Sequence, residues 1–397
     1  YFFRDLSAYY MEWTVLADGD AVKKGVIYDL DVAPHERKVY DLGIDLAGLP
    51  AGKELMLNVE YRLKSEEGLL PAGHVTAYGQ ICLAPYSWGD AAPGSRLLSN
   101  IEDGAPEICK SDGRILVSGE DFAIGFSKLT GYISLYEYKG KEMLEEGSTL
   151  RPNFWRAPTD NDFGANLQTK YAVWKNPEIR LESLEYSTEG QLAKISARYG
   201  MPSVKGTITM DYLVSNAGKV QVSYRFDATE GAEIPDMFRF GLRMEMPEEF
   251  DTVNYYGRGP WENYSDRMES AVVGLYRQSV EEQFYPYIRP QETGTKSDLR
   301  WWEVLDISGT GLRFSSDAPF SASALEYSIE TLDEGAAKIN RHQTDVVKGG
   351  MTYLCIDKAQ MGLGCIDSWG ALPLEKYRLH CSDRSFTLLI EPVEHSL

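Results

Sequence analysis

The sequence predicts an all-β protein in which an immunoglobulin-like β-sandwich is followed by a larger antiparallel β-sandwich. Three observations predict this class. Segments of alternating or β-branched apolar residues recur along the 397 residues, short glycine-containing turns separate them, and helical periodicity is rare. A chain of this length is also long enough for two or three domains, each with its own core.

The predicted strands are short apolar segments divided by turn sequences. In chain order they include MEWTVLAD, ELMLNVEYRL, RILVSGEDFAIGF, YISLYEYKG, AKISARYG, GTITMDYLV, KVQVSYRFDA and FTLLIEPVE. Sequences such as ADGD, SNAGK, SKLTG and DISGTG mark the turns between strands. Helical turns are expected only in KYAVWKNPE and in parts of GRGPWENYSDR.

Changes in strand spacing and in composition along the chain predict two domains and a linker. Residues 1–85 hold about seven short strand patterns, which is the size and rhythm of an immunoglobulin-like sandwich. Residues 86–107 are rich in Gly, Pro, Ser and Asp and are predicted to be a linker. Residues 108–397 show many strands without a fixed repeat, so one large sandwich is expected rather than a propeller or solenoid.

Composition opposes nucleic-acid binding, a membrane span, a disulfide framework and a metal site. A formal net charge of -20 opposes nucleic-acid binding, which requires clustered Lys and Arg. No apolar run of about 18 residues is present, so no membrane span is expected. Five cysteines without CxxC spacing and five scattered histidines predict neither a disulfide framework nor a metal site.

The first residue, Tyr1, follows no initiator methionine and no signal peptide. We therefore expect the chain to be a piece of a longer protein. Any targeting signal, and with it the information on cell compartment, would lie upstream.

Residues 151–164, RPNFWRAPTDNDFG, form the first distinctive segment. Two prolines and a final glycine predict an irregular loop. Asp160, Asn161 and Asp162 are consecutive acceptors that could bind a cation, cap a turn or hold sugar hydroxyls. The alternative is a structural loop in which Arg156 pairs with one of these carboxylates. The segment lacks the spacing and terminal glutamate of a calcium-binding loop.

Two further segments, YYGRGPWENYSDR at 255–267 and PYIRPQETGTKSDLRWW at 286–302, combine charged, aromatic and glycine residues. This composition predicts a rigid polar scaffold beneath a cleft, with Glu262, Asp266 and Glu292 as candidate carboxylates. The alternative is a framework of salt bridges without a chemical role.

Residues 362–373, GLGCIDSWGALP, place Trp369 in a glycine-rich loop. A tryptophan in such a loop either folds back into its own core or presents its ring to a ligand. The C–H face of a sugar packs well on an indole ring, so the second alternative predicts carbohydrate as the ligand.

Together these segments resemble the C-terminal region of the large β-galactosidases of glycoside hydrolase family 2, in the same order along the chain. YFFRDLSAYYMEWTVLADG and LLPAGHVTAYGQICLA also resemble the first and last strands of the sandwich that follows the catalytic barrel in that family. The resemblance covers essentially the whole chain. It implies an immunoglobulin-like domain up to about residue 85 and, from about residue 106, a β-supersandwich similar to galactose mutarotase.

The resemblance also implies roles for two loops. In the family, a tryptophan on a loop of the last domain stacks on the sugar in the entry subsite, and GCIDSW matches that loop, so the role is expected of Trp369. Asp160, Asn161, Asp162 and Gly164 match the start of a mobile loop at the mouth of the site.

Catalysis is expected to reside elsewhere. Retaining glycosidases use two carboxylates about 5 Å apart, and in this family both are glutamates on a (β/α)8 barrel of about 250 residues. The resemblance therefore implies that the glutamates and the Mg and Na ligands lie upstream, and that neither Glu262 nor Glu292 is catalytic. The expected partners are a β-galactoside, the missing N-terminal and barrel domains, and further copies of the parent protein in a homo-oligomer.

Two other functions stay open. One is an independent carbohydrate-binding module. The other is an aldose 1-epimerase, which needs a general acid and base on opposite sides of a sugar, for which His342 or His380 with a glutamate could serve.

Overall fold

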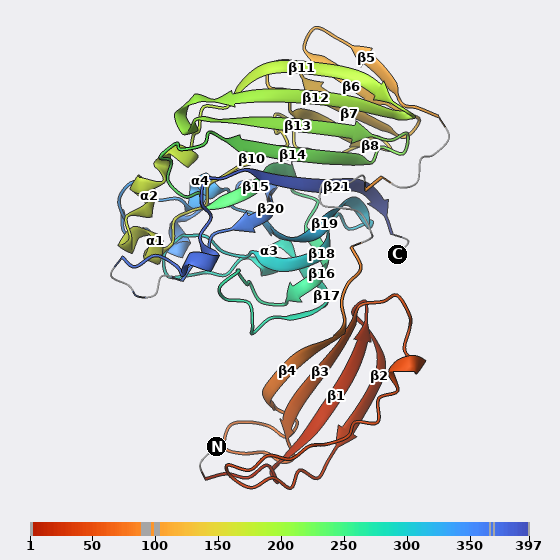
Figure 1. The fold of residues 1–397 in the computed structure, drawn as a ribbon, viewed down its shortest axis with the longest axis vertical. Helices are drawn as coiled ribbons and strands as arrows, with labels where there is room; N and C mark the ends of the chain where they lie inside the picture. Colours follow the sequence, from red (N-terminus) through yellow and green to blue (C-terminus); the bar gives the residue numbers. More distant parts are fainter. Residues whose placement is uncertain (1–2, 89–96, 99–103, 365–366, 368–369, 396–397) are drawn as a thin grey trace. The chain divides into compact units, whose positions relative to one another are not determined.

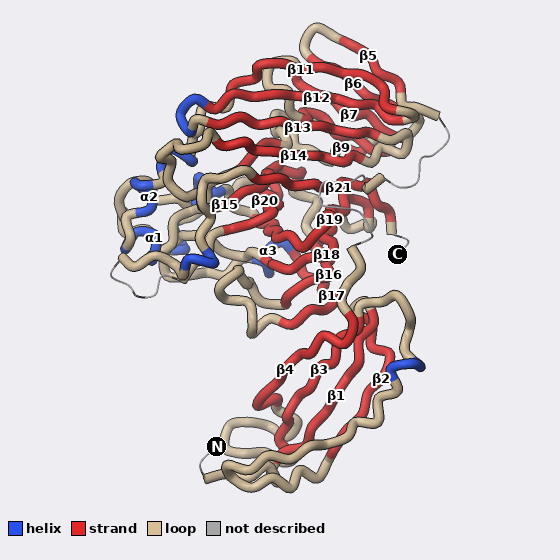
Figure 2. The backbone as a smooth tube through the Cα atoms, viewed as in Figure 1, coloured by secondary structure: helices blue, strands red, loops and turns tan. Residues whose placement is uncertain are grey.

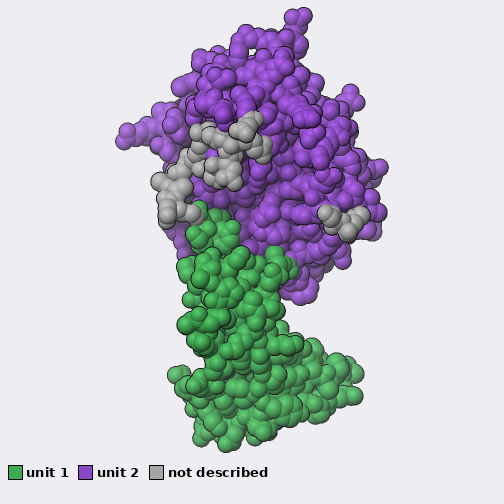
Figure 3. All heavy atoms as spheres, turned by 90° about the vertical axis from the view of Figure 1, so that its right-hand side faces the viewer, with its two compact units in different colours: residues 1–90, 272–275 green, residues 91–271, 276–397 purple. Residues whose placement is uncertain are grey.

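The computed structural model describes residues 3–88, 97–98, 104–364, 367 and 370–395. It divides into two compact units, which Figure 3 shows in different colours. Unit 1 comprises residues 1–90 with 272–275, and unit 2 comprises residues 91–271 with 276–397.

Unit 1 contains one antiparallel sheet with the strand order β2-β1-β3-β4 (Figure 1). Its elements are β1 (Tyr9–Ala17), β2 (Asp20–Ile27), the 3-10 helix η1 (Leu46–Gly48), β3 (Leu55–Leu63) and β4 (Val75–Ala84). Alternation along β1 buries Trp13 and Val15, and Val15 lies opposite Leu57 of β3, so all three share one face. Leu42 and Ile44 pack against this face.

The four described strands of unit 1 are fewer than the seven or so patterns in the sequence. Residues 28–54 form irregular chain and η1 rather than strands, as the tan tube in Figure 2 shows. This segment still supplies apolar side chains to the core of the unit. Burial of those side chains does not require a hydrogen-bonded ladder, which explains why apolar spacing overestimated the number of strands.

Unit 2 contains two antiparallel sheets. The smaller has the order β5-β6-β7-β8-β9, with β5 (Glu107–Lys110), β6 (Arg114–Ser118), β7 (Phe122–Ser127), β8 (Ile133–Tyr138) and β9 (Lys141–Glu142). The larger has twelve strands, namely β10 (Arg151–Asn153), β11 (Arg180–Glu189), β12 (Leu192–Met201), β13 (Gly206–Val214), β14 (Val220–Ala228), β15 (Arg239–Pro247), β16 (Thr252–Gly259), β17 (Val272–Ser279), β18 (Lys296–Leu305), β19 (Thr310–Leu325), β20 (Met351–Gln360) and β21 (Arg384–Glu394).

The path through the larger sheet is β10-β15-β20-β19-β21-β14-β13-β12-β11, and β18, β16 and β17 branch from β19. Strands β11 to β14 are sequential neighbours, whereas β21, the last strand, joins β14 to β19. The C-terminal segment therefore holds the two halves of the sheet together (Figure 1). No other ladder of main-chain hydrogen bonds among the described strands joins these two halves.

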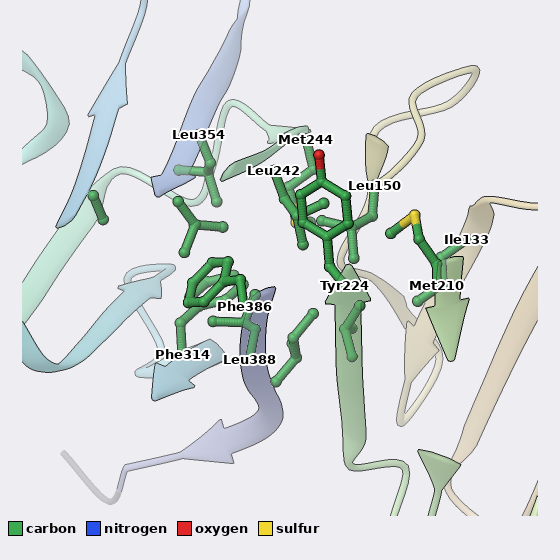
Figure 4. Close-up of a cluster of buried hydrophobic side chains, with 14 of the residues drawn as sticks. Ile133, Leu150, Met210, Tyr224, Leu242, Met244, Phe314, Leu354, Phe386 and Leu388 are labelled. Carbon is green, nitrogen blue, oxygen red and sulfur yellow. The ribbon is translucent and has the colours of Figure 1, made fainter. Parts of the chain in front are cut away.

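One apolar core links the two sheets of unit 2. Phe126 of β7 contacts Tyr212 of β13 with ring centroids 5.0 Å apart, and the Tyr136 hydroxyl of β8 donates to the Gly218 carbonyl at 2.6 Å. Figure 4 shows Ile133 of β8 beside Met210 of β13 in this cluster. The sandwich predicted for the second part of the chain is thus confirmed, as is the all-β class.

Helices are short. They are α1 (Asp160–Gly164), α2 (Leu167–Lys170), α3 (Val280–Gln283) and α4 (Ile329–Leu332), with 3-10 turns η2 (Ala172–Trp174), η3 (Pro202–Val204), η4 (Gln343–Asp345) and η5 (Glu375–Tyr377). The helical turn expected in KYAVWKNPE is present as η2, and GRGPWENYSDR carries none. Among the residues described, no helix has the length and apolar character needed to cross a bilayer.

The prediction that residues 151–164 lack regular structure was wrong. β10 lies at an edge of the larger sheet, where Pro152 is tolerated because one side of the strand needs no ladder bonds. Thr159 then caps α1: its hydroxyl accepts from the Asp162 amide, while the Asp162 carboxylate accepts from the Thr159 amide. This capping box was overlooked because the prolines dominated the pattern.

Candidate functional site

The loop that follows β20 begins on a set of hydrogen bonds to its main chain, which we call the loop base: Met361, Gly362, Leu363 and Gly364 with the side chains of Arg156, Asn161 and Asp266. Arg156 donates to the carbonyls of Met361 at 2.6 Å and Gly362 at 3.2 Å. Asn161 donates to the Leu363 carbonyl at 3.1 Å. The segment 151–164 therefore holds three consecutive carbonyls of the loop.

Asp266 binds main-chain amides of the same loop. Its carboxylate accepts from the Leu363 amide at 3.1 Å and the Gly364 amide at 2.7 Å. A Cβ atom on Gly362 would lie 2.5 Å from this carboxylate, so the close approach requires glycine. Three of the segments noted in the sequence thus meet at the loop base.

Arg156 can serve as an anchor because its charge is compensated internally. The guanidinium, which is fully buried, donates to the Asp162 carboxylate from Nε at 3.1 Å and from one terminal nitrogen at 2.8 Å. It also lies 4.7 Å from the centre of the Phe238 ring. Bidentate pairing of this kind is strong and directional, so it fixes the guanidinium in the plane that reaches the loop carbonyls.

The other predicted residues of α1 have different environments. Asp162 is buried and committed to Arg156, whereas Asp160 is exposed and pairs with Lys338 and Arg289. Gly164 ends α1, and a Cβ atom on Gly370 would lie 3.1 Å from its carbonyl oxygen. The chain after the loop therefore returns beside α1, with Gly370 at a φ of +100° that suits glycine.

Trp369 lies outside the described residues. The choice between core packing and ligand contact, and the role of Trp369 in sugar stacking, therefore stay predictions.

The candidate carboxylates are engaged as a framework. Glu262 accepts from the Thr293 hydroxyl at 3.1 Å and the Gly294 amide at 2.8 Å, and also pairs with Arg267 and the Tyr287 hydroxyl. Each oxygen of Glu262 therefore has two donors. Asp266 is likewise bound to the main chain of the loop. These contacts favour the alternative in which the carboxylates form a framework of salt bridges without a chemical role.

Glu292 belongs to a second buried cluster that the sequence analysis missed. Arg239 donates to Glu292 at 3.0 Å, and its Nε lies 3.6 Å from the Asp357 carboxylate. Burial raises the pKa of Asp357 to about 7; the charge of Arg239 opposes the rise and that of Glu292 adds to it. Charged residues inside apolar strand patterns could have indicated this cluster. They are Arg239, at the start of RFGLRMEM, and Asp357, within YLCIDK.

Of the two histidines considered for epimerase chemistry, His380 has structural partners on its ring, whereas the bond at His342 comes from its main chain. The two ring nitrogens of His380 contact Asp236 at 2.7 Å and Glu375 at 2.5 Å, and these hydrogen bonds raise the pKa of His380. Both nitrogens are thus occupied by carboxylates. The His342 amide donates to the Asp345 carboxylate and caps η4.

Possible metal ligands are dispersed in the part of the chain that the structure describes. There, no group of three or more His, Cys, Asp or Glu residues is placed to hold a metal ion. The four described cysteines, Cys82, Cys109, Cys355 and Cys381, are free thiols, and Cys365 lies outside the described residues.

Two family models match the chain. Residues 118–390 match the family described as beta galactosidase small chain. Residues 1–84 match beta-galactosidase, domain 4.

Curated relatives match over most of the chain. A beta-galactosidase of Priestia megaterium is 30% identical over 97% of this chain and 36% of its own length. One from Lactobacillus delbrueckii subsp. bulgaricus is 34% identical over 73% of this chain and 28% of its own length. One from Streptococcus thermophilus is 29% identical over 98% of this chain and 36% of its own length. The chain thus spans about a third of the length of these relatives.

Among solved structures, a putative aldose 1-epimerase from Escherichia coli K12 aligns with 71% of this chain and 99% of its own. The TM-score is 0.40 and the identity 10%. A likeness at this level has no bearing on activity.

Proposed function

Because the chain belongs to the β-galactosidase family, we propose that it is the non-catalytic C-terminal part of a retaining β-galactosidase. The parent enzyme would hydrolyse terminal non-reducing β-D-galactosides, and this part would shape the rim of the active site. The loop base is the observation that carries the proposal. Its buried anchor gives the loop with Trp369 a rigid foundation, which a residue that positions a sugar requires.

The hydrogen bonds of the candidate carboxylates support the proposal that this chain is a non-catalytic part of the enzyme. A retaining glycosidase needs one carboxylate free to attack and a second, about 5 Å away, free to exchange a proton. Glu262, Asp266 and Glu292 instead accept hydrogen bonds from arginine, hydroxyl or main-chain donors. The two catalytic glutamates and the Mg and Na ligands are therefore expected in the rest of the protein.

We assign the parent to glycoside hydrolase family 2 and expect it to be a homo-oligomer. The order of the four sequence segments along the chain supports the first assignment. Multi-angle light scattering of the parent enzyme would test the second, and a monomeric mass would contradict it.

The experiment compares the chain with its parent enzyme, using nitrophenyl β-galactoside and lactose. The 397-residue chain should show no hydrolysis. In the parent, Trp369→Ala should raise KM for lactose about tenfold or more through loss of the stacking surface, and Trp369→Phe should restore part of it. Ile307→Ala, at an exposed apolar residue on another turn, is the matched control and should leave KM unchanged.

Two outcomes would overturn the proposal. One is hydrolysis by the chain alone that Glu262→Gln abolishes, because the chain would then carry its own catalytic carboxylate. The other is an unchanged KM for Trp369→Ala.

A further inference from the structure

Unit 2 carries a groove of about 650 Å³ between the turn after β16 and the segment after α3. Aromatic side chains form much of its wall, and charged or amide side chains complete the lining. The aromatic members are Trp261, Phe284, Tyr285 and Tyr287, and the others include Glu262, Arg267, Gln278, Glu282, Gln283 and Lys296. The volume is typical of small-molecule sites.

The aromatic wall is open to solvent. Trp261 is 64% exposed and Tyr285 is 56% exposed. Tyr285 is supported by Tyr287, with ring centroids 4.7 Å apart. Large exposed rings gain free energy when an apolar surface covers them, so this wall provides a stacking surface.

The charged and amide side chains of the groove, which we call the polar floor, are held in place by hydrogen bonds. Lys296, which is 1% exposed, donates to the Gln283 side-chain oxygen at 2.9 Å and to the Gly294 carbonyl at 3.1 Å. Gln283 in turn donates to Gln278 at 2.8 Å, and Glu262 is fixed by its four donors. A floor fixed in advance lowers the entropy lost when a ligand binds.

Lys296 has capacity for one more acceptor. An ammonium group has three protons, and among the described residues Lys296 has two acceptors. Burial lowers the pKa of Lys296 to about 8, and the charge of Glu262 acts in the opposite direction. A ligand oxygen that reaches the third proton would favour the charged form.

The balance of charge identifies the ligand class. Arg267 and Lys296 carry positive charge and Glu262 and Glu282 carry negative charge, so the four charged side chains of the lining sum to zero. A lining without net charge gives an ionic ligand no net electrostatic attraction, which favours an uncharged one. It offers donors and acceptors to hydroxyl groups and aromatic faces to a flat C–H surface, which are the two features of a pyranose ring.

We propose that this groove binds a neutral saccharide, with a pyranose ring stacked on Trp261, the more exposed of the two rings, and a sugar hydroxyl hydrogen bonded to Lys296. The lining residues all lie between Pro260 and Lys296, so the proposal requires neither Trp369 nor the proposed function. A rival explanation is that another part of the parent protein covers Trp261 and Tyr285.

Isothermal titration of the 397-residue chain with lactose and cellobiose tests the proposal. Saturable binding should weaken at least tenfold in Trp261→Ala. Ile288→Ala is the matched control, because Ile288 is 82% exposed on the same segment as Tyr285 and is absent from the lining, and it should bind within about twofold of the unchanged chain. Trp369→Ala should also retain binding.

The pH dependence of sugar affinity tests the role of Lys296. Affinity should fall as pH rises from about 7 to about 9, because the ammonium loses the proton that it donates to the ligand. Lys296→Met should remove this pH dependence, provided that its circular dichroism matches that of the unchanged chain. If Lys296→Met fails to fold, Trp261→Ala still decides the proposal.

Three results would overturn it. The first is the absence of saturable binding to either disaccharide. The second is unchanged binding in Trp261→Ala, or loss in Trp369→Ala alone, which would transfer sugar binding to the loop and leave the proposed function intact. The third is protection of Trp261 from N-bromosuccinimide oxidation in the parent enzyme without sugar, which would show that another part of the protein covers the groove.

Discussion

The apolar core of unit 2 and Arg156, the anchor of the loop base, are both inaccessible to solvent but are stabilised in different ways. In the core, side chains such as Phe240 and Leu388 are inaccessible to solvent and contact other apolar groups. At the loop base, the inaccessible Arg156 is stabilised by Asp162 and by main-chain carbonyls. An apolar residue tolerates many neighbours, whereas a buried charge requires specific partners.

This difference determines what each region contributes. Apolar burial supplies free energy in many small, interchangeable parts. Buried ion pairs add little net stability but penalise every arrangement in which a partner is missing. We therefore expect the substitution of a buried charged residue to cost more than the truncation of an apolar residue in the core, and four predictions test this contrast.

The largest effect is expected for Arg156→Ala. The substitution leaves the Asp162 carboxylate buried without its cation and removes the donors to Met361 and Gly362. The free energy of unfolding should fall by about 4 kcal/mol, measured by urea denaturation. Arg156→Lys is the matched control: it keeps the charge, loses the forked geometry and should give an intermediate loss. A loss below about 1 kcal/mol for Arg156→Ala would contradict the contrast.

The second prediction concerns pH. The raised pKa of Asp357, about 7, means that the folded protein binds this proton more tightly than the unfolded chain does. The stability contributed by the protonated form is complete below about pH 4, the ordinary value, and is lost as pH rises through about 7. In Asp357→Asn this loss should be absent.

The measurement is the difference in unfolding free energy between Asp357→Asn and the unchanged chain at two pH values. Between about pH 4.5 and pH 7.5 the difference should shift by about 3 kcal/mol in favour of the asparagine variant. A difference that does not change with pH would show that Asp357 is ionised in the folded protein throughout the range.

A smaller effect is expected in the core. Ile390→Val removes one methylene group from a side chain that is 1% exposed, and should lower the free energy of unfolding by about 1 kcal/mol. Val347→Ala is the control, since Val347 is 76% exposed and its truncation should have little effect. Thermal unfolding of both variants would check the result. A loss as large as that of Arg156→Ala would remove the distinction between the regions.

The smallest effect is expected at an exposed ion pair. Arg198 and Glu182 lie 3.3 Å apart on β12 and β11, with about half of each side chain in solvent. Arg198→Ala should change the free energy of unfolding by about 0.5 kcal/mol or less, and added salt should reduce even that difference. A loss comparable with that of Arg156→Ala would show that charge pairing stabilises this protein regardless of burial.

The same contrast explains which features the sequence could predict. Strands β11 to β14 alternate apolar and polar residues with turns between them, so local pattern predicted them and the sandwich. The pairing of Arg156 with a carboxylate was also foreseeable, because Asp162 is six residues away. Arg239 was not foreseeable: its partner Glu292 lies 53 residues along the chain, and no local pattern specifies so distant a contact.

The errors have local causes. Pro152 in β10 suggested irregular chain, but an edge strand tolerates proline, and the capping box of Thr159 and Asp162 begins a helix immediately afterwards. In unit 1, residues 28–54 carry strand-like apolar spacing and pack on the core without pairing. Periodicity reports which side chains are buried, and hydrogen-bond pairing is a separate condition.

The loop base contacts its loop through peptide groups. Arg156 and Asn161 bind carbonyls, and Asp266 binds amides, so apart from the glycine required at position 362 the anchor does not depend on which side chains follow. Evolution, or a protein engineer, could therefore exchange residues 365–369 while keeping the attachment of the loop. Under the role proposed for Trp369, sugar preference would change through this short segment without redesign of the domain that carries it.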